Sequence, residues 1–473
     1  MKSRLSKPQK NPAEIPSASQ DQSGPLAQLN NVEISAVAFG GKGIGRVDGK
    51  VFFVADAVPG DVVDIEVTND SGRYADAKIV LFQQLSPLRG KSPCAFSEKC
   101  GGCQWHGIPY EQQLGWKRQF VETALGRIGK VEASVPVSIS GASGTLEYRN
   151  RIFVRGVFAA DGSMSFGYFQ RGSRNLVPIN RCAIAGVTIN RVLGRLGHAK
   201  IERPKSLLAV TPYRMELQEI PPQPGGSDES ISGSVGEAKV VITVYPPSPD
   251  CRDLDAFVEG LRQTEGVFWA GLIKDLKAAP LVVFDEQDGL RYHTRPGQFQ
   301  QVNVSHNRLV RSLVHELVDG YKPARILDLF CGSGNLSLGL CRADRYVEGI
   351  EFSEPAIATA RENVRINKIT NALYLSGSSE KHLWKCAKKG EQFDVVIADP
   401  PREGMFKDLI PLQKIGAKAI IYVSCDPATL ARDLGALIRG GYQLKWVRSF
   451  DFFPNTWHVE TIAVLEKSPE EKV

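Results

Sequence analysis

Residues 324–335 read Ala-Arg-Ile-Leu-Asp-Leu-Phe-Cys-Gly-Ser-Gly-Asn, and this stretch decides the fold. Its apolar run, residues 326–330, predicts a buried parallel strand that breaks at Gly332 and Gly334. The segment that follows, residues 336–341, has the apolar content of a helix. A strand, a glycine-rich turn and a helix form the mouth of a doubly wound sheet, where ligands bind beyond the carboxyl ends of the strands. The sequence therefore predicts an α/β domain with a ligand site at this turn.

The alternation of strands and helices extends to both sides of the turn. After residue 297, apolar spacing predicts helices and strands in turn, which is typical of a mainly parallel sheet covered by helices. A short connection joins the last two strands and indicates an antiparallel pair that closes the sheet. The predicted strands span residues 326–330, 346–351, 393–399, 419–424, 442–450 and 459–465, and the predicted helices span residues 306–317, 354–367 and 429–439.

The turn also limits which ligand fits. The third glycine of a dinucleotide-binding fingerprint is absent, and Ser337 stands in its place. That argues against NAD and leaves S-adenosylmethionine, which has no pyrophosphate to seat. Glu351 ends the second strand, where a carboxylate can accept hydrogen bonds from both hydroxyls of an adenosyl ribose. Both features suit S-adenosylmethionine. The alternative for the glycine-rich turn is a tight turn with a purely structural role, and the alternative for Glu351 is a surface carboxylate without a ligand.

The segments before residue 297 have different patterns. Residues 1–26 are rich in Lys, Ser, Gln and Pro and predict a disordered basic tail. Short alternating runs between residues 32 and 82 predict an antiparallel barrel of about five strands, a fold that often binds oligonucleotides. We expect three domains: an OB-like barrel at 27–86, a central α+β domain at 87–296 and the doubly wound α/β domain at 297–473. Within the central domain, the sequence predicts a helix over 109–128, mixed strands over 148–218, a loop at 221–238 and strands near 240–244, 267–273 and 280–284.

The composition is that of a globular protein with a slight excess of positive charge. The 473 residues carry a net charge of +6, which permits a polyanionic partner without requiring one. No run of 18 apolar residues predicts a membrane span, and the N-terminus lacks the apolar segment of a secretory signal. Nine cysteines in such a chain are expected to be thiols, metal ligands or reactive groups in the cytoplasm.

Three of these cysteines lie within ten residues, at Cys94, Cys100 and Cys103. Their spacing is too close for three independent core positions, so it indicates a metal site. Cys182 is the nearest later cysteine and is the candidate fourth ligand. Zinc and an iron–sulfur cluster both suit thiolates, and the spacing does not choose between them.

Two strand ends carry groups suited to pyrimidine chemistry. Cys425 follows the predicted strand 419–424, although a lone cysteine there is often only a buried apolar residue. A thiolate that adds to C6 of a pyrimidine makes C5 able to attack a methyl sulfonium, and a base must then remove the C5 proton. Glu460 is our candidate for that base. At another strand end, Arg402 follows Asp399-Pro-Pro. Enzymes that methylate an exocyclic amine usually have an aromatic residue at this position, which stacks on the target base, so Arg402 argues against that reaction.

Together these motifs resemble the family of S-adenosylmethionine-dependent RNA uracil-5-methyltransferases. The closer resemblance is to the branch that acts on 23S ribosomal RNA and carries an N-terminal TRAM domain and a [4Fe–4S] cluster. It covers the chain from about residue 30 to residue 467. The motifs that carry it are Cys-Gly-Gly-Cys at 100–103, Phe-Gln-Gln-Val-Asn at 299–303, Asp-Leu-Phe-Cys-Gly-Ser-Gly-Asn at 328–335, Asp-Pro-Pro-Arg-Glu-Gly at 399–404, Ser-Cys-Asp-Pro-Ala-Thr-Leu-Ala-Arg-Asp at 424–433 and His-Val-Glu-Thr at 458–461.

The resemblance implies a role for each matching residue. It implies a nucleophile at Cys425, a base at Glu460 and a TRAM barrel over residues 32–85. It also implies two sets of ligand-binding residues. The implied [4Fe–4S] ligands are Cys94, Cys100, Cys103 and Cys182, and the implied S-adenosylmethionine contacts are Gln301, Phe330, Asn335, Glu351 and Asp399.

We therefore predict a cytoplasmic, monomeric enzyme that forms 5-methyluridine in structured RNA, in particular 23S ribosomal RNA, without membrane contact. The target base must leave its stack to reach Cys425, which implies base flipping. Alternatives are a methyltransferase for the T-loop uridine of tRNA and a non-catalytic RNA-binding iron–sulfur protein, and the presence of both Cys425 and Glu460 argues against the latter. The side chains expected to contact RNA are Tyr148, Arg149, Arg151, Phe153, Arg171 and Arg174.

Overall fold

The computed structural model describes residues 27–131, 135–159, 162–207, 211–222 and 237–469. The predicted tail at 1–26 and most of the predicted loop at 221–238 lie outside the described residues. The chain divides into two compact units, Met1–Ala38 with Lys42–Pro87, and Phe39–Gly41 with Leu88–Val473. Within the described ranges, no helix is long and apolar enough to cross a membrane.

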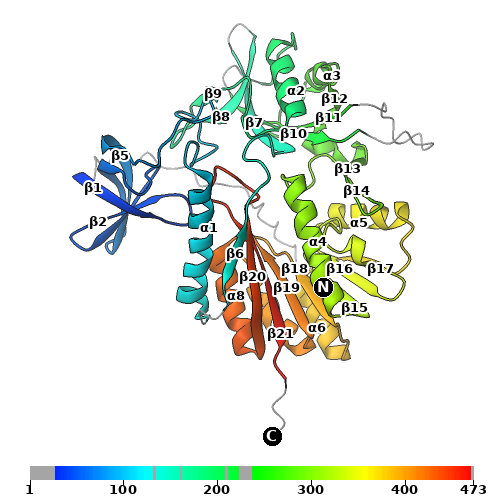
Figure 1. The fold of residues 1–473 in the computed structure, drawn as a ribbon. Helices are drawn as coiled ribbons and strands as arrows, with labels where there is room; N and C mark the ends of the chain where they lie inside the picture. The colour runs from blue at the N-terminus through cyan, green and yellow to red at the C-terminus, as the bar shows by residue number, and fades with distance from the viewer. Residues whose placement is uncertain (1–26, 132–134, 160–161, 208–210, 223–236, 470–473) are drawn as a thin grey trace, which may run out of the picture. The chain divides into compact units, whose positions relative to one another are not determined.

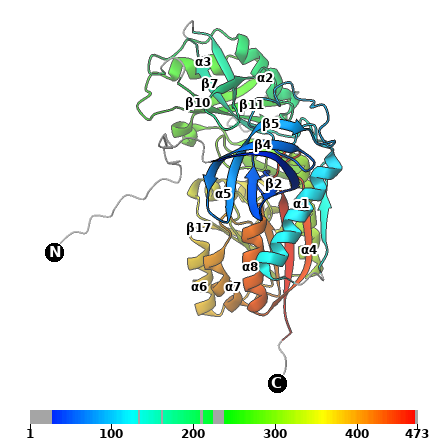
Figure 2. The same cartoon turned by 90° about the vertical axis from the view of Figure 1, so that its left-hand side faces the viewer.

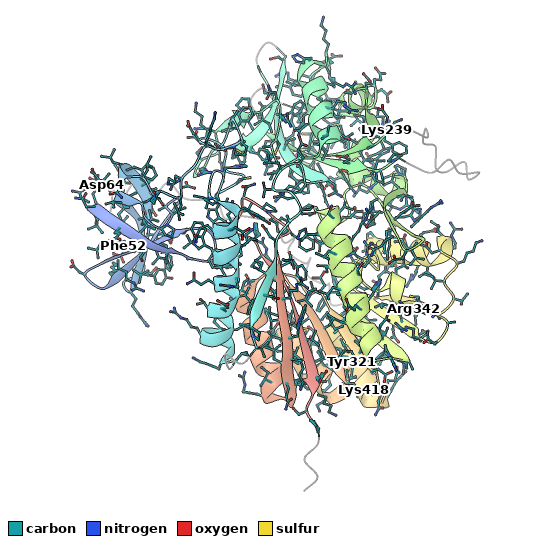
Figure 3. The ribbon with its side chains drawn as sticks, viewed as in Figure 1. Phe52, Asp64, Lys239, Tyr321, Arg342 and Lys418 are labelled. Atoms are coloured by element: carbon teal, nitrogen blue, oxygen red, sulfur yellow. The ribbon has the colours of Figure 1, made fainter. Side chains whose placement is uncertain are left out.

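The first unit is a closed barrel of five strands, as the sequence predicts, except that residues 50–54 and 74–84 pair in parallel rather than antiparallel. Alternating residues such as Val32, Ile34 and Phe52 are buried inside it, and Phe52 is labelled in Figure 3. Pairing of the first strand with the fourth closes the barrel and leaves no unpaired sheet edge. The strands are β1 (Gln28–Val37), β2 (Gly43–Val47), β3 (Lys50–Val54), β4 (Val62–Asp70) and β5 (Tyr74–Gln84), in the spatial order β1-β2-β3-β5-β4.

The second unit contains an eight-stranded, mainly parallel sheet (Figure 1). Its last two long strands run antiparallel to each other, as the short connection between them predicts. The strand at its edge comes from the segment that the sequence assigned to the central domain. In spatial order the strands are β17 (Ala372–Ser376), β16 (Tyr346–Glu351), β15 (Arg325–Leu329), β18 (Val395–Ala398), β19 (Ala419–Ser424), β21 (Glu460–Lys467), β20 (Tyr442–Phe450) and β6 (Val137–Ser140).

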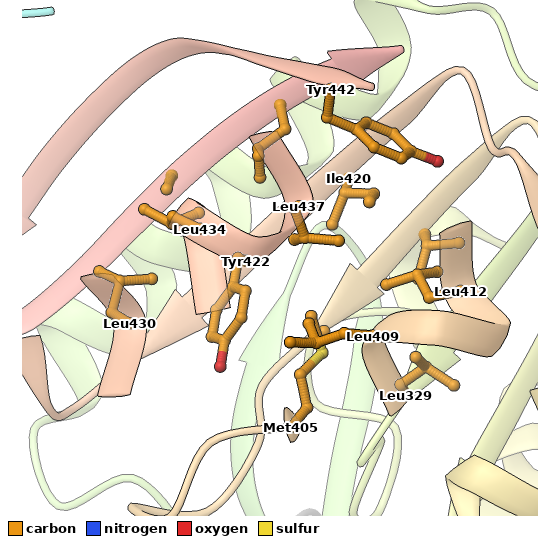
Figure 4. Close-up of a cluster of buried hydrophobic side chains, with 14 of the residues drawn as sticks. Leu329, Met405, Leu409, Leu412, Ile420, Tyr422, Leu430, Leu434, Leu437 and Tyr442 are labelled. Atoms are coloured by element: carbon orange, nitrogen blue, oxygen red, sulfur yellow. The ribbon is translucent and has the colours of Figure 1, made fainter. Parts of the chain in front are cut away.

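Helices cover both faces of this sheet. On one face, leucines of the helices pack on Leu329, Ile420 and Tyr422, as Figure 4 shows. On the other face, Val310 and its neighbours pack on the remaining apolar residues of the same strands. The first face is covered by α1 (Tyr110–Ala124), α6 (Ser379–Lys389), α7 (Leu409–Ile415) and α8 (Pro427–Arg439), the second by α4 (Val304–Gly320), and α5 (Glu354–Ile366) lies beside β17.

A separate six-stranded sheet forms the central part of the second unit. Two helices pack their apolar residues on one of its faces, and in Figures 1 and 2 they lie on the side away from the eight-stranded sheet. A hairpin of β13 (Val282–Gln287) and β14 (Leu290–Thr294) follows it. In spatial order the strands are β12 (Val267–Leu272), β11 (Lys239–Tyr245), β10 (Tyr213–Ile220), β7 (Arg151–Phe158), β8 (Met164–Phe169) and β9 (Leu176–Pro178), and the helices are α2 (Val187–His198) and α3 (Asp255–Arg262).

Two expectations about local structure need correction. The predicted helix over residues 336–341 is wrong, because only Leu338–Leu340 form a turn of 3-10 helix. Gly339 lies so close to the ring of His315 that a Cβ there would stand 2.4 Å from it, and the alternate leucines are apolar because they are buried rather than helical. The mixed strands predicted over 148–218 also contain α2, whose β-branched residues and glycines disguise its helical pattern.

The carboxyl ends of the parallel strands point toward the six-stranded sheet. Tyr321 and Lys418 precede β15 and β19 and mark the opposite, amino ends at the bottom of Figure 3. In doubly wound sheets the ligand crevice lies at the carboxyl ends. The ligand site of this doubly wound sheet is therefore expected at the strand ends that face the six-stranded sheet.

Candidate active site

Strand pairing brings the predicted site residues to one edge of the sheet. Phe330 directly follows β15 and Asp399 follows β18, and the preceding residues of these two strands are paired. Cys425 follows β19 and Glu460 begins β21, and the pairing of Ser424 with Thr461 sets these two residues opposite each other. Because adjacent strands lie about 4.8 Å apart, these four residues occupy consecutive positions along the edge.

A cavity at the carboxyl ends of the strands is lined by most of the residues predicted to contact S-adenosylmethionine. It is lined by Gln301, Asn335, Asp399 and Glu460, which come from four separate parts of the chain. Asn307 from α4 also lines it, and the rest of the wall is apolar. Four residues that the sequence singled out separately thus surround one space, whereas Phe330, Glu351 and Cys425 do not line it.

Buried carboxylates dominate the electrostatics of the site. Burial is the main cause that raises the pKa of Asp328 to about 7, and the charges of Asp399 and Glu351 act in the same direction. Burial also raises the pKa of Asp399 to about 7 and raises that of Glu460 well above its ordinary value. Because desolvation disfavours the charged form of each carboxylate, a cationic ligand in the cavity would restore their ionisation.

The glycine-rich turn has the backbone conformation that a close approach requires. Phe330 has a φ of +61° and Gly334 a φ of +85°. A Cβ at Gly334 would also stand 3.0 Å from the hydroxyl of Tyr374. Left-handed backbone at a non-glycine residue such as Phe330 costs energy and is concentrated at functional sites. Glu351 lies beside the turn, where its carboxylate accepts hydrogen bonds from the backbone N–H of Gly332 at 3.3 Å and of Ser353 at 2.8 Å.

A buried network that the sequence did not reveal holds Asn335 in the cavity wall. Arg311 of α4 is fully buried, and it donates to the backbone carbonyl of Asn335 at 3.1 Å and to its side-chain Oδ1 at 3.0 Å. Asn307 exchanges two further hydrogen bonds with Asn335, at 2.9 and 3.0 Å. The sequence did contain one sign of this network: Arg311 is a charged residue between Val310 and Val314, on the apolar face of a predicted helix.

Cys425 is half-buried. Its pKa is raised to about 12, chiefly by burial and also by Glu460 and Asp399, while Arg402 opposes the rise. The chain turns into α8 directly after it, because Asp426 accepts hydrogen bonds from the backbone N–H groups of residues 428 and 429 at 2.9 Å each. The sequence singled out Arg402 only as a replacement for an aromatic residue after Asp-Pro-Pro, and it did not indicate that the charge of Arg402 acts on Cys425.

His458 is held in aromatic contacts beside this arginine. Its ring lies 3.8 Å from that of Trp457 and 5.4 Å from that of Phe453. Burial, with Arg402 contributing, lowers the pKa of His458 to about 3, so the ring is neutral. Its Nδ1 lies 3.3 Å from Nη2 of Arg402, which is a donor, so this nitrogen accepts.

The loop that leads to Glu460, residues 451–459, is fixed by buried contacts. Lys117 of α1 and Asp451 form a fully buried ion pair at 2.5 Å, and Lys117 also donates to the carbonyl of Phe453 at 3.0 Å. The backbone carbonyl of Asn455 accepts from the N–H groups of Gln104 and Trp105 at 3.1 and 3.0 Å. The segment after the cysteine motif is therefore tied to the loop before Glu460.

The four predicted metal-ligating cysteines are free thiols that influence one another. Burial raises the pKa of Cys103 to about 12 and also raises that of Cys100, and in both cases the charges of Cys182 and Cys94 add to the rise. The backbone N–H of Gly102 donates to Cys100 Sγ at 3.4 Å. In the part of the chain that the structure describes, no three His, Cys, Asp or Glu side chains form a group that could hold a metal ion.

The residues expected to contact RNA divide into two groups. Arg151 is buried in an ion pair with Glu216, and Arg171 donates to the backbone carbonyls of the cysteine segment. Arg149 lies over the rings of Tyr148 and Phe453. These contacts are internal, whereas Phe153 and Arg174 are exposed.

Comparisons with known proteins identify relatives along nearly the whole chain. A family model described as tRNA (Uracil-5-)-methyltransferase matches residues 274–468, and a TRAM domain model matches residues 28–80. An RNA methyltransferase of Thermosynechococcus vestitus, itself described as uncharacterized, is 32% identical over 92% of this chain and 98% of its own length. A Pseudomonas putida protein named 23S rRNA (uracil(1939)-C(5))-methyltransferase RlmD is 31% identical over 93% of this chain and 94% of its own.

One solved structure shares the fold of most of the chain. It is the Pyrococcus abyssi tRNA (uracil-54, C5)-methyltransferase in complex with S-adenosyl-L-homocysteine, with a TM-score of 0.66 and 24% identity. The likeness covers 92% of this chain and 100% of that one. The fold that the sequence predicted for the barrel and for the doubly wound domain is confirmed.

Proposed function

The chain belongs to the family of RNA uracil-5-methyltransferases, and we propose that it methylates C5 of a specific uridine in 23S ribosomal RNA with S-adenosylmethionine as the methyl donor. The observation that carries this proposal is the placement of Cys425 opposite Glu460, beside a cavity lined by Asp399. Relatives that align with more than nine-tenths of the chain include proteins named as 23S rRNA uracil-C5-methyltransferases, which favours ribosomal RNA over tRNA. We expect the enzyme to act as a monomer in the cytoplasm, where ribosomal RNA is made.

We propose that S-adenosylmethionine binds at the carboxyl ends of β15, β16 and β18, with its charged groups toward the carboxylate-lined cavity. The chemistry of the wall supports this, because the sulfonium and ammonium groups of that molecule are cations and the wall holds two buried carboxylates, Asp399 and Glu460. Glu351 and the glycine-rich turn suit the ribose and the close approach of the adenosyl group. When bound, S-adenosylmethionine supplies an electrophilic methyl group. The proposed contacts are Gln301, Phe330, Asn335, Glu351 and Asp399.

Cys425 and Glu460 act on the uracil ring in different steps. Cys425 adds its sulfur to C6, which makes C5 an enolate carbon able to accept the methyl group. Glu460 then removes the proton that remains on C5, and the bond between C6 and sulfur breaks to release 5-methyluridine and free Cys425. The raised pKa of Glu460 makes it a strong proton acceptor once it is ionised. Arg402 supports the ionised forms of both groups, since its charge lowers both pKa values.

We also propose that Cys94, Cys100, Cys103 and Cys182 hold a [4Fe–4S] cluster. The four cysteines are free thiols, which are a soft donor set that suits iron–sulfur chemistry, although in the described residues they are not gathered into a metal-holding group. A backbone N–H directed at Cys100 sulfur is the kind of contact that tunes such a cluster. A cluster at this place would brace the segment that is bonded to Asn455, and through it the loop before Glu460.

The RNA specificity is tested by methylation of two transcripts with methyl-labelled S-adenosylmethionine, followed by nuclease digestion and nucleoside analysis. We expect labelled 5-methyluridine at one position of a 23S rRNA transcript and none in a tRNA transcript. Label in the T-loop of tRNA would instead support the tRNA alternative. Binding of both RNAs without any label in either would support a non-catalytic RNA-binding protein.

The cluster is tested by anaerobic purification with iron and sulfide analysis. We expect a brown protein with broad absorbance near roughly 400 nm and about four irons per chain. The Cys182→Ser variant should lose most of that iron, while Cys251→Ser, a change at a cysteine in the core of the six-stranded sheet, should retain it. A colourless protein with stoichiometric zinc would contradict the cluster without bearing on methylation.

A further inference from the structure

One face of the six-stranded sheet carries a group of cationic and aromatic side chains that the proposed mechanism does not use. We call it the arginine–aromatic face, and its members are Phe153, Arg155, Phe169, Arg214 and Tyr245. They come from β7, β8, β10 and β11 and share a face because of register, since Arg214 is paired with Arg155 on one side and with Tyr245 on the other. The opposite face of the same sheet is covered by α2 and α3.

The rings and guanidinium groups of this face lie against one another. The guanidinium carbon of Arg214 is 4.0 Å from the ring centre of Tyr245 and 4.5 Å from that of Phe153. Arg155 lies 5.1 Å from the ring centre of Phe169. Phe153 exposes 38% of its surface, which is unusual for a phenylalanine in a sheet. The rings therefore lie against the arginines, and Phe153 also remains accessible.

The two arginines lack the acidic partners that other cations of the chain have. Among the described residues, neither Arg155 nor Arg214 forms an ion pair. Lysines of the barrel, by contrast, are neutralised in pairs. Like charges directly opposite each other on paired strands destabilise a sheet, so a bound anion would relieve this repulsion. The barrel pairs are Lys42–Asp76 at 2.6 Å, Lys50–Asp70 at 2.7 Å and Lys78–Glu66 at 2.7 Å.

Polar contacts on the same face connect it to the candidate active site. Arg151 lies two residues before Phe153 and donates to the backbone carbonyl of Gln298 at 2.7 Å. Gln218 on β10 donates to the side chain of Gln300 at 2.7 Å. The next residue, Gln301, lines the ligand cavity. A strand of RNA that runs from the target uridine over residues 298–301 would therefore reach the arginine–aromatic face.

We propose that the arginine–aromatic face binds an unpaired stretch of the RNA substrate next to the methylated uridine. Exposed rings on a sheet stack on nucleobases, and guanidinium groups beside them bind phosphates. Phe153 and Tyr245 provide the stacking surfaces, and Arg155 and Arg214 provide the phosphate contacts. The inference rests on the proposed function, because it assigns the RNA partner of that reaction to a specific surface.

The test measures binding of the full-length, cluster-containing protein to a 23S rRNA transcript and to a 12-nucleotide oligouridine over a range of salt concentrations. We expect Phe153→Ala to weaken binding to both RNAs about tenfold without changing the salt dependence. Arg155→Ala should reduce the slope of log Kd against log salt by about 0.7, the value for one phosphate contact with a single strand. Arg191→Ala is the matched control, because Arg191 lies on α2, which covers the opposite face, and it should change neither quantity.

Several outcomes would overturn the proposal, and each is separable from failure of the proposed function. If the parent protein methylates 23S rRNA but Phe153→Ala and Arg155→Ala bind and methylate like Arg191→Ala, the face is not an RNA site. If these variants fail only on ribosomal particles and bind free RNA normally, the face contacts a protein. If the parent protein binds RNA through this face but forms no 5-methyluridine, the proposed function fails and the surface assignment stands. Equal melting temperatures and S-adenosylmethionine affinities across the variants ensure that all are folded.

Discussion

The ligand cavity and the arginine–aromatic face differ in the sign and the burial of their charged side chains. Around the cavity, Asp328, Asp399 and Glu460 are buried, and burial raises their pKa values. On the sheet face, Arg155 and Arg214 remain partly exposed and lie on aromatic rings. A buried carboxylate wall is completed by a small cation, whereas exposed guanidinium groups on rings are completed by a polyanion. The difference teaches that a single chain can separate its recognition of a methyl donor from its recognition of RNA.

The largest expected effect lies on the cavity side and should leave the sheet face untouched. Glu460→Gln removes the proposed proton acceptor but keeps the shape of the side chain. We expect turnover of 23S rRNA to fall by roughly 100- to 10,000-fold. RNA affinity, measured in parallel, should stay within about twofold of the parent protein. Normal turnover in this variant would remove Glu460 from the mechanism.

A second prediction contrasts a buried paired cation with an exposed unpaired one. Lys117→Met leaves Asp451 buried without its partner and should lower the free energy of unfolding by about 3–5 kcal/mol. Arg155→Met should change it by less than about 0.5 kcal/mol. Chemical denaturation of both variants and of the Lys117→Met, Asp451→Asn double variant checks this, since the double variant should recover part of the loss. A large loss for Arg155→Met would show that the sheet face is needed for folding rather than for binding.

Binding of RNA and binding of S-adenosylmethionine should depend differently on salt concentration. Raising monovalent salt from 50 to 200 mM should weaken binding of 23S rRNA by roughly 10- to 100-fold, because phosphate contacts release counterions. Binding of S-adenosylmethionine should change by less than about twofold, since its charges are held in a buried cavity that salt screens weakly. Titrations of both ligands in the same buffers provide the measurement. Equal salt dependence would contradict the division into a buried and an exposed charge region.

A further expected effect is a pH dependence of stability to which the buried carboxylates of the site contribute. Asp328 and Asp399 have pKa values of about 7 in the folded chain, above the ordinary value of 3.8, so the folded state binds more protons between about pH 4 and 7. The ligand-free protein should therefore lose stability as the pH rises through this window, because each of the two carboxylates favours the folded state less as it ionises. Melting curves at pH 5 to 8 should show a flatter dependence for Asp399→Asn. A profile unchanged by this substitution would mean that Asp399 is ionised throughout.

Local patterns predicted the strands of the site almost to the residue. The strand before Cys425 was predicted at 419–424 and is found there, because a fully buried apolar run with a polar end is distinctive. Asp399 and Glu460 were placed at strand ends for the same reason. The roles of these residues came from a family resemblance rather than from the pattern, and they remain proposals.

Contacts between distant segments could not be predicted in this way. The hydrogen bonds of Arg311 to Asn335 and of Asn455 to Gln104 join residues that no local period relates. The arginine–aromatic face likewise depends on the register of β7 with β10, which the sequence of neither strand specifies alone. The helix expected over residues 336–341 failed because burial of alternate leucines resembles helical content when the turn geometry is unknown.

The central claim is that the sulfur of Cys425 bonds to C6 of the target uracil. It is tested most directly by incubating the protein and S-adenosylmethionine with 23S rRNA that contains 5-fluorouridine, because a C5 fluorine cannot be removed as a proton. We predict a stable protein–RNA complex by denaturing electrophoresis, with the RNA fragment attached to Cys425 by mass spectrometry, in the parent protein and in Cys251→Ala. No complex should form with Cys425→Ala. A complex that persists in Cys425→Ala, or methylation by the parent protein of unmodified RNA without any trapped complex, would contradict the account.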